Sequence, residues 1–331
     1  MPRQLRSTDV VIVGMGAAGG VAALPLAEAG LDVVGLEAGT WLDQRDFAPD
    51  EIRNNYRDWP MLVKKCENER PTSRATSATN ANRVGGHPMM NAVGGTAVHY
   101  WAQSWRLNPW DFQVVSETAR RYGRSKIPAN STVEDWPFGY DELEPYYDRV
   151  EREIGVSGQA GNVSGNIDLK GNRFEGPRKR PYPMPPLRWT GFLETMADAA
   201  HSLGWHPFPG PAAINSERYD GRAGCAYHGF CSKGGCPVNA KNSPHLTTIP
   251  KALDTGNLRI VTQAHVTTLE MDGEGRVTGV NYVVGNEEYF QPAKVVLLAC
   301  YTYENVRLLL LSKSSAYPDG LSNNHGQVGR H

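Results

Sequence analysis

The feature that most constrains this chain is a glycine-rich turn near its N-terminus, between a short apolar run and a helix-forming segment. Val10–Val13 is an apolar, β-branched-rich run of the kind that forms a strand covered on both faces. Gly14, Gly16 and Gly19 follow in the spacing G-x-G-x-x-G. In a strand–turn–helix unit the first glycine permits a sharp turn, the second lets the backbone approach a pyrophosphate, and the third lets the helix pack closely on the strand. The pattern predicts a Rossmann-type α/β fold with a dinucleotide site.

A second apolar run, Leu31–Gly39, supports this interpretation. It ends in Glu37, at roughly the separation of 20 residues from the glycine turn at which an acidic residue accepts hydrogen bonds from ribose hydroxyls. An acid there disfavours NADP, because the 2′-phosphate requires a basic partner. The motif alone leaves FAD and NAD as alternatives.

Composition and charge exclude some classes of partner. The chain has 331 residues, which corresponds to about two domains. Its formal net charge of -1 gives no electrostatic reason to expect nucleic acid or an acidic membrane surface. The uncharged segment Val10–Ala27 follows a basic start, as a secretory signal does, but its glycines favour the dinucleotide turn. No other segment reaches the ~18 uninterrupted apolar residues of a transmembrane helix. We expect no direct membrane span, and the compartment, cytoplasmic or periplasmic, stays open.

Later segments carry a family resemblance. His87–Phe112 contains a Gly-Gly pair, a histidine and an Asn-Pro-Trp-Asp-Phe turn, and Asp135–Gly158 reads as a helix. Asn257–Val283 reads as strands around an Asp-Gly-Glu-Gly turn, and Ala293–Ser314 as a strand followed by a helix. These segments together resemble the glucose–methanol–choline (GMC) oxidoreductase family over nearly the whole chain. They are most similar to the dehydrogenase branch that includes the flavoprotein subunit of gluconate 2-dehydrogenase.

The resemblance implies a Rossmann-type FAD-binding domain with an inserted α+β substrate domain. Residues 1–150 are expected to form the first part of the FAD-binding domain, and residues 151–214 a segment of the substrate domain. Residues 215–331 are expected to return to the FAD-binding domain and to carry a cysteine cluster. The family continues beyond the position of His331, where it has most of the substrate-domain sheet, the catalytic His-His or His-Asn pair and a final segment that contacts FAD. The catalytic C-terminal portion is therefore expected to be absent, and no catalytic residue is assigned.

The resemblance also assigns residues to FAD. Gly94, Gly95 and Thr96 correspond to the loop that lies along the flavin, and a backbone group at Val266 corresponds to the contact with adenine. His99 has two interpretations. It corresponds to the histidine through which some members attach flavin covalently, and it equally suits a side chain that packs near a non-covalently bound isoalloxazine ring.

Three local expectations follow from patterns in the middle of the chain. In the predicted helix, Asp141 serves as the cap, with Glu144 three residues on, and one face is formed by Tyr140, Leu143, Tyr147, Val150 and Ile154. The basic run at residues 177–180 reads as a solvated loop. Lys241 and His245 are expected in a solvated or cofactor-facing loop.

Cys225, Cys231 and Cys236 form a close group followed by Pro237. Short spacing and a proline after the last cysteine are features of iron–sulfur loops, and some members of the resembled branch carry a cluster in this part of the chain. Zinc with His228 as the fourth ligand is an alternative. A disulfide that uses Cys66 or Cys300, or simple structural thiols, are further alternatives.

The resemblance implies an FAD-dependent oxidoreductase that acts on CH–OH groups of sugars, sugar acids or polyols. A base removes the hydroxyl proton while hydride passes to the flavin, and the electrons leave to an external acceptor such as cytochrome c or a quinone. A small subunit is a candidate partner. An oxidase that uses oxygen is the near alternative. A non-catalytic FAD-binding fragment or an inactive remnant is the alternative from another class, and this chain alone is expected to be inactive.

Overall fold

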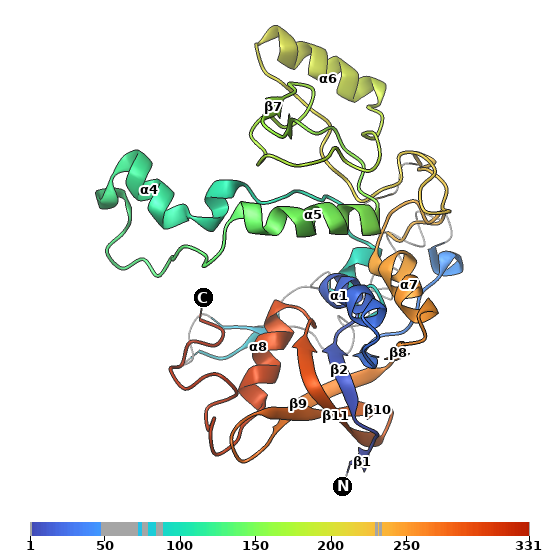
Figure 1. The fold of residues 1–331 in the computed structure, drawn as a ribbon, viewed down its shortest axis with the longest axis vertical. Coiled ribbons are helices and arrows are strands. Elements are labelled where there is room, and N and C mark those ends of the chain that lie inside the picture. Colours follow the sequence, from blue (N-terminus) through green and yellow to red (C-terminus); the bar gives the residue numbers. More distant parts are fainter. Residues whose placement is uncertain are drawn as a thin grey trace. The chain divides into compact units, whose positions relative to one another are not determined.

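The apolar run near the N-terminus forms β2 (Thr8–Val13), at the centre of a mixed seven-stranded sheet (Figure 1). The computed structural model describes residues 2–47, 72–74, 79–83, 89–228, 231 and 234–330. Four strands are parallel, in the order β8 (Leu258–Val261), β3 (Val33–Leu36), β2 and β11 (Glu287–Leu298). Beyond β11 the sheet continues as an antiparallel meander through β10 (Val277–Val284) and β9 (Ala264–Met271). The short β1 (Arg3–Gln4) pairs in parallel with the first half of β11.

Both faces of β2 are buried, as its sequence predicts. Val10 and Ile12 pack in a cluster with α1 (Ala17–Glu28) and α7 (Thr248–Asp254). Val11 and Val13 belong to a second cluster, which includes residues of the meander and of α8 (Thr302–Leu311). The predicted Rossmann-type α/β fold is confirmed, with the strand–turn–helix unit at its centre.

Smaller elements complete the part of the chain that contains the sheet. They are η1 (Gln44–Phe47), β4 (Thr72–Ser73), β5 (Asn82–Arg83), η3 (Gly95–Val98) and η6 (Pro244–Leu246). The middle of the chain contains η4 (Pro109–Phe112), α4 (Val114–Tyr122), η5 (Arg124–Lys126), α5 (Tyr140–Ile154), β6 (Asn162–Val163), β7 (Asn166–Ile167) and α6 (Gly191–Ser202).

The chain divides into two units. Unit 1 comprises Met1–Trp101, His228–Pro237 and Ser243–His331, and unit 2 comprises Ala102–Tyr227 and Val238–Asn242. The predicted boundaries at residues 150 and 214 do not coincide with this division, because residues 102–150, expected in the FAD-binding domain, belong to unit 2. The role of unit 2 in substrate binding stays a prediction. Among the described residues, no helix combines the length and the apolar character that crossing a bilayer requires.

The predicted cap of α5 is wrong, and the buried side chains of the helix are mostly acids rather than the apolar residues of the expected face. Gly139 precedes the helix, and its N–H donates to Glu142 Oε1 at 3.0 Å, so the acid that closes the first turn is not Glu144. The apolar positions on the expected face are only half-buried, apart from Tyr140. The fully buried side chains of α5 are, besides that tyrosine, the acids Glu144, Asp148 and Glu151.

The acidic face of α5 is buried because arginines from other parts of unit 2 pair with it. Arg106 donates to both carboxylate oxygens of Glu151 at 2.8 Å, and to Glu144 at 3.2 Å. Arg178 also donates to Glu151. Arg178 belongs to the run at residues 177–180 that we expected to be a solvated loop, yet it is 1% exposed. That expectation is therefore wrong for Arg178, because its guanidinium pairs with buried carboxylates.

Candidate functional site

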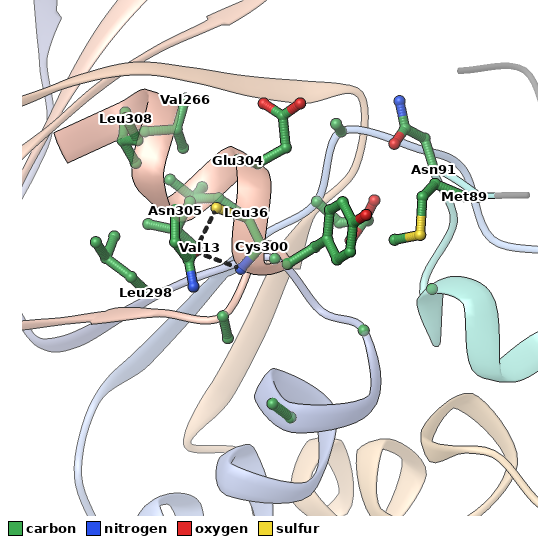
Figure 2. Close-up of a pocket in the computed structure, with 18 of the residues that line it drawn as sticks. Val13, Leu36, Met89, Asn91, Val266, Leu298, Cys300, Glu304, Asn305 and Leu308 are labelled. Atoms are coloured by element: carbon green, nitrogen blue, oxygen red, sulfur yellow. Dashed lines mark hydrogen bonds between the residues drawn. The ribbon is translucent and has the colours of Figure 1, made fainter. Parts of the chain in front are cut away.

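A cavity of about 440 Å³ opens in unit 1 at the carboxyl ends of β2, β3 and β11 (Figure 2). Val13, Leu36 and Leu298, the last residues of these strands, contribute to its wall. In parallel α/β sheets this edge is where ligands bind. Six residues that the sequence assigns to a dinucleotide line the cavity: Gly14, Gly16, Glu37, Gly95, Thr96 and Val266.

The three glycines of the turn have different surroundings. Gly14 has φ +91°, and a Cβ there would lie 2.6 Å from the Cα of Cys300, so neither the conformation nor the space admits a side chain. A Cβ on Gly19 would lie 2.0 Å from the carbonyl oxygen of Gly14, which explains why Gly19 serves close packing and does not line the cavity. A Cβ on Gly16 would come no closer than 3.8 Å, to the Cα of Gly95. Gly16 therefore leaves open space on the cavity side.

The start of α1 faces the same space. Gly16 is the N-cap, so no side chain is available there to accept from the first N–H groups of the helix. Ala17 and Ala18 follow and line the cavity. Uncapped N–H groups and the positive end of the helix dipole favour an anion such as a pyrophosphate.

Glu37 is held in place by the backbone around the turn. It is 6% exposed, and it lines the cavity. Its Oε2 accepts from the N–H of Met15 at 3.0 Å, and its Oε1 accepts from the N–H of Gly39 at 2.9 Å. Each carboxylate oxygen can accept more than one hydrogen bond, so the same group can also receive ribose hydroxyls.

The Gly-Gly loop packs directly on the glycine turn. Gly94 has φ +94° and donates its N–H to the carbonyl of Met15 at 2.8 Å. A Cβ on Gly95 would lie 2.8 Å from the Cα of Gly16. Gly94 does not line the cavity, because it faces His245, whose Nδ1 would lie 2.8 Å from a Cβ at this position. His245 is buried, so its loop is not solvated but packs behind the Gly-Gly loop.

His99 is not among the residues that line the cavity. It ends the short helix η3, where its N–H donates to the carbonyl of Thr96 at 3.1 Å, and its side chain is 4% exposed. His99 is therefore buried outside the cavity lining, and covalent attachment through it stays a prediction.

Sequence reasoning missed the start of α8 as part of the site. Cys300, Tyr301, Glu304 and Asn305 all line the cavity. Asn305 Oδ1 accepts from the N–H of Cys300 at 3.1 Å and from its thiol at 2.9 Å, which ties the first turn of α8 to the end of β11 (Figure 2). The strand-then-helix pattern of Ala293–Ser314 is the signal that could have identified these residues, because a helix that follows a parallel strand begins at the ligand-binding edge.

A second missed group precedes the Gly-Gly loop. Met89, Met90 and Asn91 line the cavity, and Figure 2 shows Met89 and Asn91 apart from the side chains around Cys300. His87, which begins the segment with the family resemblance, lies outside the described residues.

The cysteines give no assembled metal site in the part of the chain that the structure describes. Cys225 belongs to unit 2, and Cys231 and Cys236 belong to unit 1. Among the described residues, no three His, Cys, Asp or Glu side chains gather in an arrangement suited to a metal ion, and the described cysteines form no disulfide with one another. Cys66 lies outside the described residues. The metal site at Cys225, Cys231 and Cys236 therefore stays a prediction from spacing.

Comparisons with known proteins agree with this geometry. Residues 192–330 match a family model described as GMC oxidoreductase. The gluconate 2-dehydrogenase flavoprotein of Pantoea cypripedii is 32% identical over 348 residues, which cover 99% of this chain and 56% of that protein. The fructose dehydrogenase large subunit of Gluconobacter japonicus is 30% identical, over 100% of this chain and 59% of that protein. The chain thus spans little more than half the length of these relatives.

A solved structure supports the same fold. The crystal structure of pyridoxine 4-oxidase from Mesorbium loti superposes with a TM-score of 0.53 at 19% identity, over 92% of this chain and 52% of that one. At this identity the likeness concerns the fold alone, and it agrees with the α/β architecture around the cavity. The chain belongs to the GMC oxidoreductase family, and it resembles the N-terminal portion of that family.

Proposed function

We propose that this chain forms the FAD-binding part of an oxidoreductase that acts on CH–OH groups of sugars, sugar acids or polyols. The observation that supports the proposal most directly is the cavity of unit 1. Its lining includes the glycine turn, the start of α1, Glu37, Val266 and Gly95 of the Gly-Gly loop. FAD, rather than NAD, suits this set because Gly95 and Thr96, which the family resemblance assigns to the loop along the flavin, line the same cavity.

The residues present fit the cofactor. At Gly16 the backbone borders open space beside Gly95, so a pyrophosphate can approach the backbone there without meeting a side chain. The start of α1 offers N–H groups to a pyrophosphate, and Glu37 offers carboxylate oxygens to ribose hydroxyls. Bound FAD would supply a hydride acceptor, to which the carbon of an alcohol transfers its hydrogen. The role of this chain's own residues is to bind and orient that group and to exclude water from it.

The names of the relatives support the substrate class. Besides the gluconate and fructose dehydrogenases, a 2-methyl-1,2-propanediol dehydrogenase of Mycolicibacterium austroafricanum matches at 30% identity. The names share a hydroxylated small molecule as substrate. Because the fructose enzyme is named as a large subunit, a small subunit is a reasonable partner for this protein too, with cytochrome c or a quinone as the final electron acceptor.

An oxygen-using oxidase is the second candidate. The paromamine 6'-oxidase of Streptomyces fradiae is 31% identical over 98% of this chain. We favour a dehydrogenase because the relatives named for gluconate, fructose and 2-methyl-1,2-propanediol are all dehydrogenases. Comparing oxygen consumption with dye reduction under the same conditions separates the two candidates.

The cofactor is the first quantity to measure. The purified protein, reconstituted with FAD and freed of excess by gel filtration, is expected to retain flavin absorbance, whereas NAD is expected to wash off. Anaerobic addition of gluconate, glucose, sorbitol or fructose to the full-length protein is then expected to bleach the flavin with at least one of them, whereas the flavin of this chain alone is expected to stay oxidised. Bound NAD without flavin would contradict the proposal. Retained FAD that no alcohol reduces would favour the alternative, an FAD-binding module without catalysis of its own.

The cysteine cluster needs a test of its own. From the spacing of Cys225, Cys231 and Cys236 and the following Pro237, we expect iron and acid-labile sulfide in anaerobically purified protein. Replacement of Cys231 by serine should remove both, whereas the same change at Cys300, which lies at the FAD cavity, should leave them in place. Zinc instead of iron would favour the Cys3His alternative with His228. Reactive thiols without metal would rule out both kinds of site.

A further inference from the structure

Tyr301 has a backbone conformation that tyrosine rarely adopts. It precedes α8 with φ +86° and ψ 150°. This region of backbone space is essentially restricted to glycine, and a side chain held there strains the chain. Such strain persists only where the surrounding structure enforces it, and it is most frequent at active sites and ligand clamps. The position therefore raises the question of what a tyrosine contributes there.

The surroundings of Tyr301 point to the cavity. Tyr301 lines it and is half-buried. The preceding residue, Cys300, approaches the glycine turn so closely that a Cβ on Gly14 would lie 2.6 Å from its Cα. The ring of Tyr303 meets the ring of Tyr301 edge-on, with 5.1 Å between centroids and 76° between planes. Tyr301 thus stands beside the predicted pyrophosphate position, with an outer ring packed against it.

The hydroxyl of Tyr301 is suited to a site for an anionic cofactor. Burial raises its pKa above the ordinary value for tyrosine, and the neighbouring Tyr303 and Glu304 raise it further. The phenol, which is neutral at physiological pH even at the ordinary pKa of tyrosine, therefore stays neutral and adds no negative charge next to phosphates.

We propose that Tyr301 is a cofactor-contacting residue, whose ring packs against FAD bound in the cavity and whose strained backbone is retained because it directs the ring there. The inference rests on the proposed function, since it requires FAD in this cavity. Aromatic rings contribute to binding through large contact area and through stacking.

Three variants separate the ring from the strain. Tyr301→Gly removes both, Tyr301→Ala removes the ring and keeps a side chain at positive φ, and Tyr301→Phe keeps the ring. In titrations of the apo protein with FAD, we expect the dissociation constant to rise roughly fivefold to tenfold in the glycine and alanine variants, and to stay within about twofold in the phenylalanine variant. In thermal unfolding without FAD, the glycine variant is expected to melt about 2 °C or more above the alanine variant, because only glycine relieves the strain.

Tyr303→Ala is the matched control. This neighbouring ring is 67% exposed and is not among the residues that line the cavity, so its loss is expected to change FAD affinity by less than about twofold. An equal loss of affinity in Tyr303→Ala and Tyr301→Ala would show that loosening of the turn, not contact, weakens binding, and would overturn the inference. Wild-type affinity in both Tyr301→Gly and Tyr301→Ala would overturn it as well. Absence of FAD binding by the wild-type protein would contradict the proposed function itself, and the inference with it.

Discussion

Replacement of Gly16 by valine is expected to abolish retention of FAD while unit 1 keeps its stability. A Cβ at this position meets no atom closer than the Cα of Gly95 at 3.8 Å, which is ordinary van der Waals contact. The φ angle of -76° is one that any residue adopts. The empty protein therefore has room for the Cβ, and the cavity that Gly16 lines offers room for the two methyl groups. The same side chain occupies the space into which the start of α1 directs its N–H groups, where the proposed pyrophosphate binds.

The expected effect is large because the side chain displaces the cofactor from its closest backbone contact. We expect the dissociation constant for FAD to rise at least 100-fold, which corresponds to about 2.7 kcal/mol. The melting temperature of the apo protein should stay within about 2 °C of the wild-type value. Flavin content after gel filtration and thermal unfolding without FAD measure the two quantities independently.

Two other glycines serve as comparisons. Gly273→Val places the same side chain on the exposed β9–β10 turn of unit 1, where a Cβ meets nothing within 4 Å, and should change neither quantity. Gly14→Ala is expected to lower stability as well as binding, because φ is +91° and the Cα of Cys300 is 2.6 Å from the new Cβ. Full flavin content in Gly16→Val would show that the pyrophosphate does not approach this turn, and the site assignment would be wrong.

The sequence could predict β2, the glycine turn and α1 because these elements are adjacent in the chain. Each glycine acts within a few residues of itself, so spacing alone carries the geometry. Glu37 was also predictable, since β3 pairs directly with β2 and brings its end to the same edge of the sheet. The two backbone N–H groups that fix its carboxylate come from Met15 and Gly39, and no residue type in the sequence marks them as donors.

The start of α8 was harder to predict because its place depends on a long-range pairing. Thr8 and Ala293, which begin the contact between β2 and β11, pair across most of the length of the chain. Only that pairing brings Cys300 and Tyr301 to the glycine turn. The strain at Tyr301 is a backbone property, and the sequence, which has tyrosine there, gives no sign of a positive φ.

The buried acids of α5 were not predicted for a related reason. Helical periodicity favours apolar residues as the buried face, and isolated acids are almost never fully buried. Glu151 departs from this rule because its partners Arg106 and Arg178 lie 45 and 27 residues away in sequence. Helical periodicity uses the residues of one helix only, so it cannot predict that an arginine from another segment will pair with a buried acid.

Replacement of Glu151 by glutamine is expected to cause the largest loss of stability in unit 2. Arg106 places two nitrogens on its carboxylate at 2.8 Å, and Arg178, fully buried, donates to the same group. Glutamine keeps the shape but removes the charge, and an amide nitrogen cannot accept from a guanidinium. In the variant, the buried guanidinium groups of Arg106 and Arg178 lose their shared partner. Glu175 also pairs with Arg178, but burial raises the pKa of Glu175 and disfavours its charged form, so it compensates poorly. Removing one member of a buried ionic group costs about 3–5 kcal/mol.

Urea unfolding, followed by far-ultraviolet circular dichroism and tryptophan fluorescence, measures the loss. Glu153→Gln on the same helix is the matched control, because the side chain of its partner Arg149 is 48% exposed and exposed pairs contribute about 0–1 kcal/mol. Added salt should reduce the small effect at Glu153 and leave the large effect at Glu151 nearly unchanged, since buried pairs are screened much less than exposed ones. If Glu151→Gln lowers the free energy of unfolding no more than Glu153→Gln does, water must hydrate the two arginines in the variant. The acidic face of α5 would then be solvated and not buried against Arg106 and Arg178.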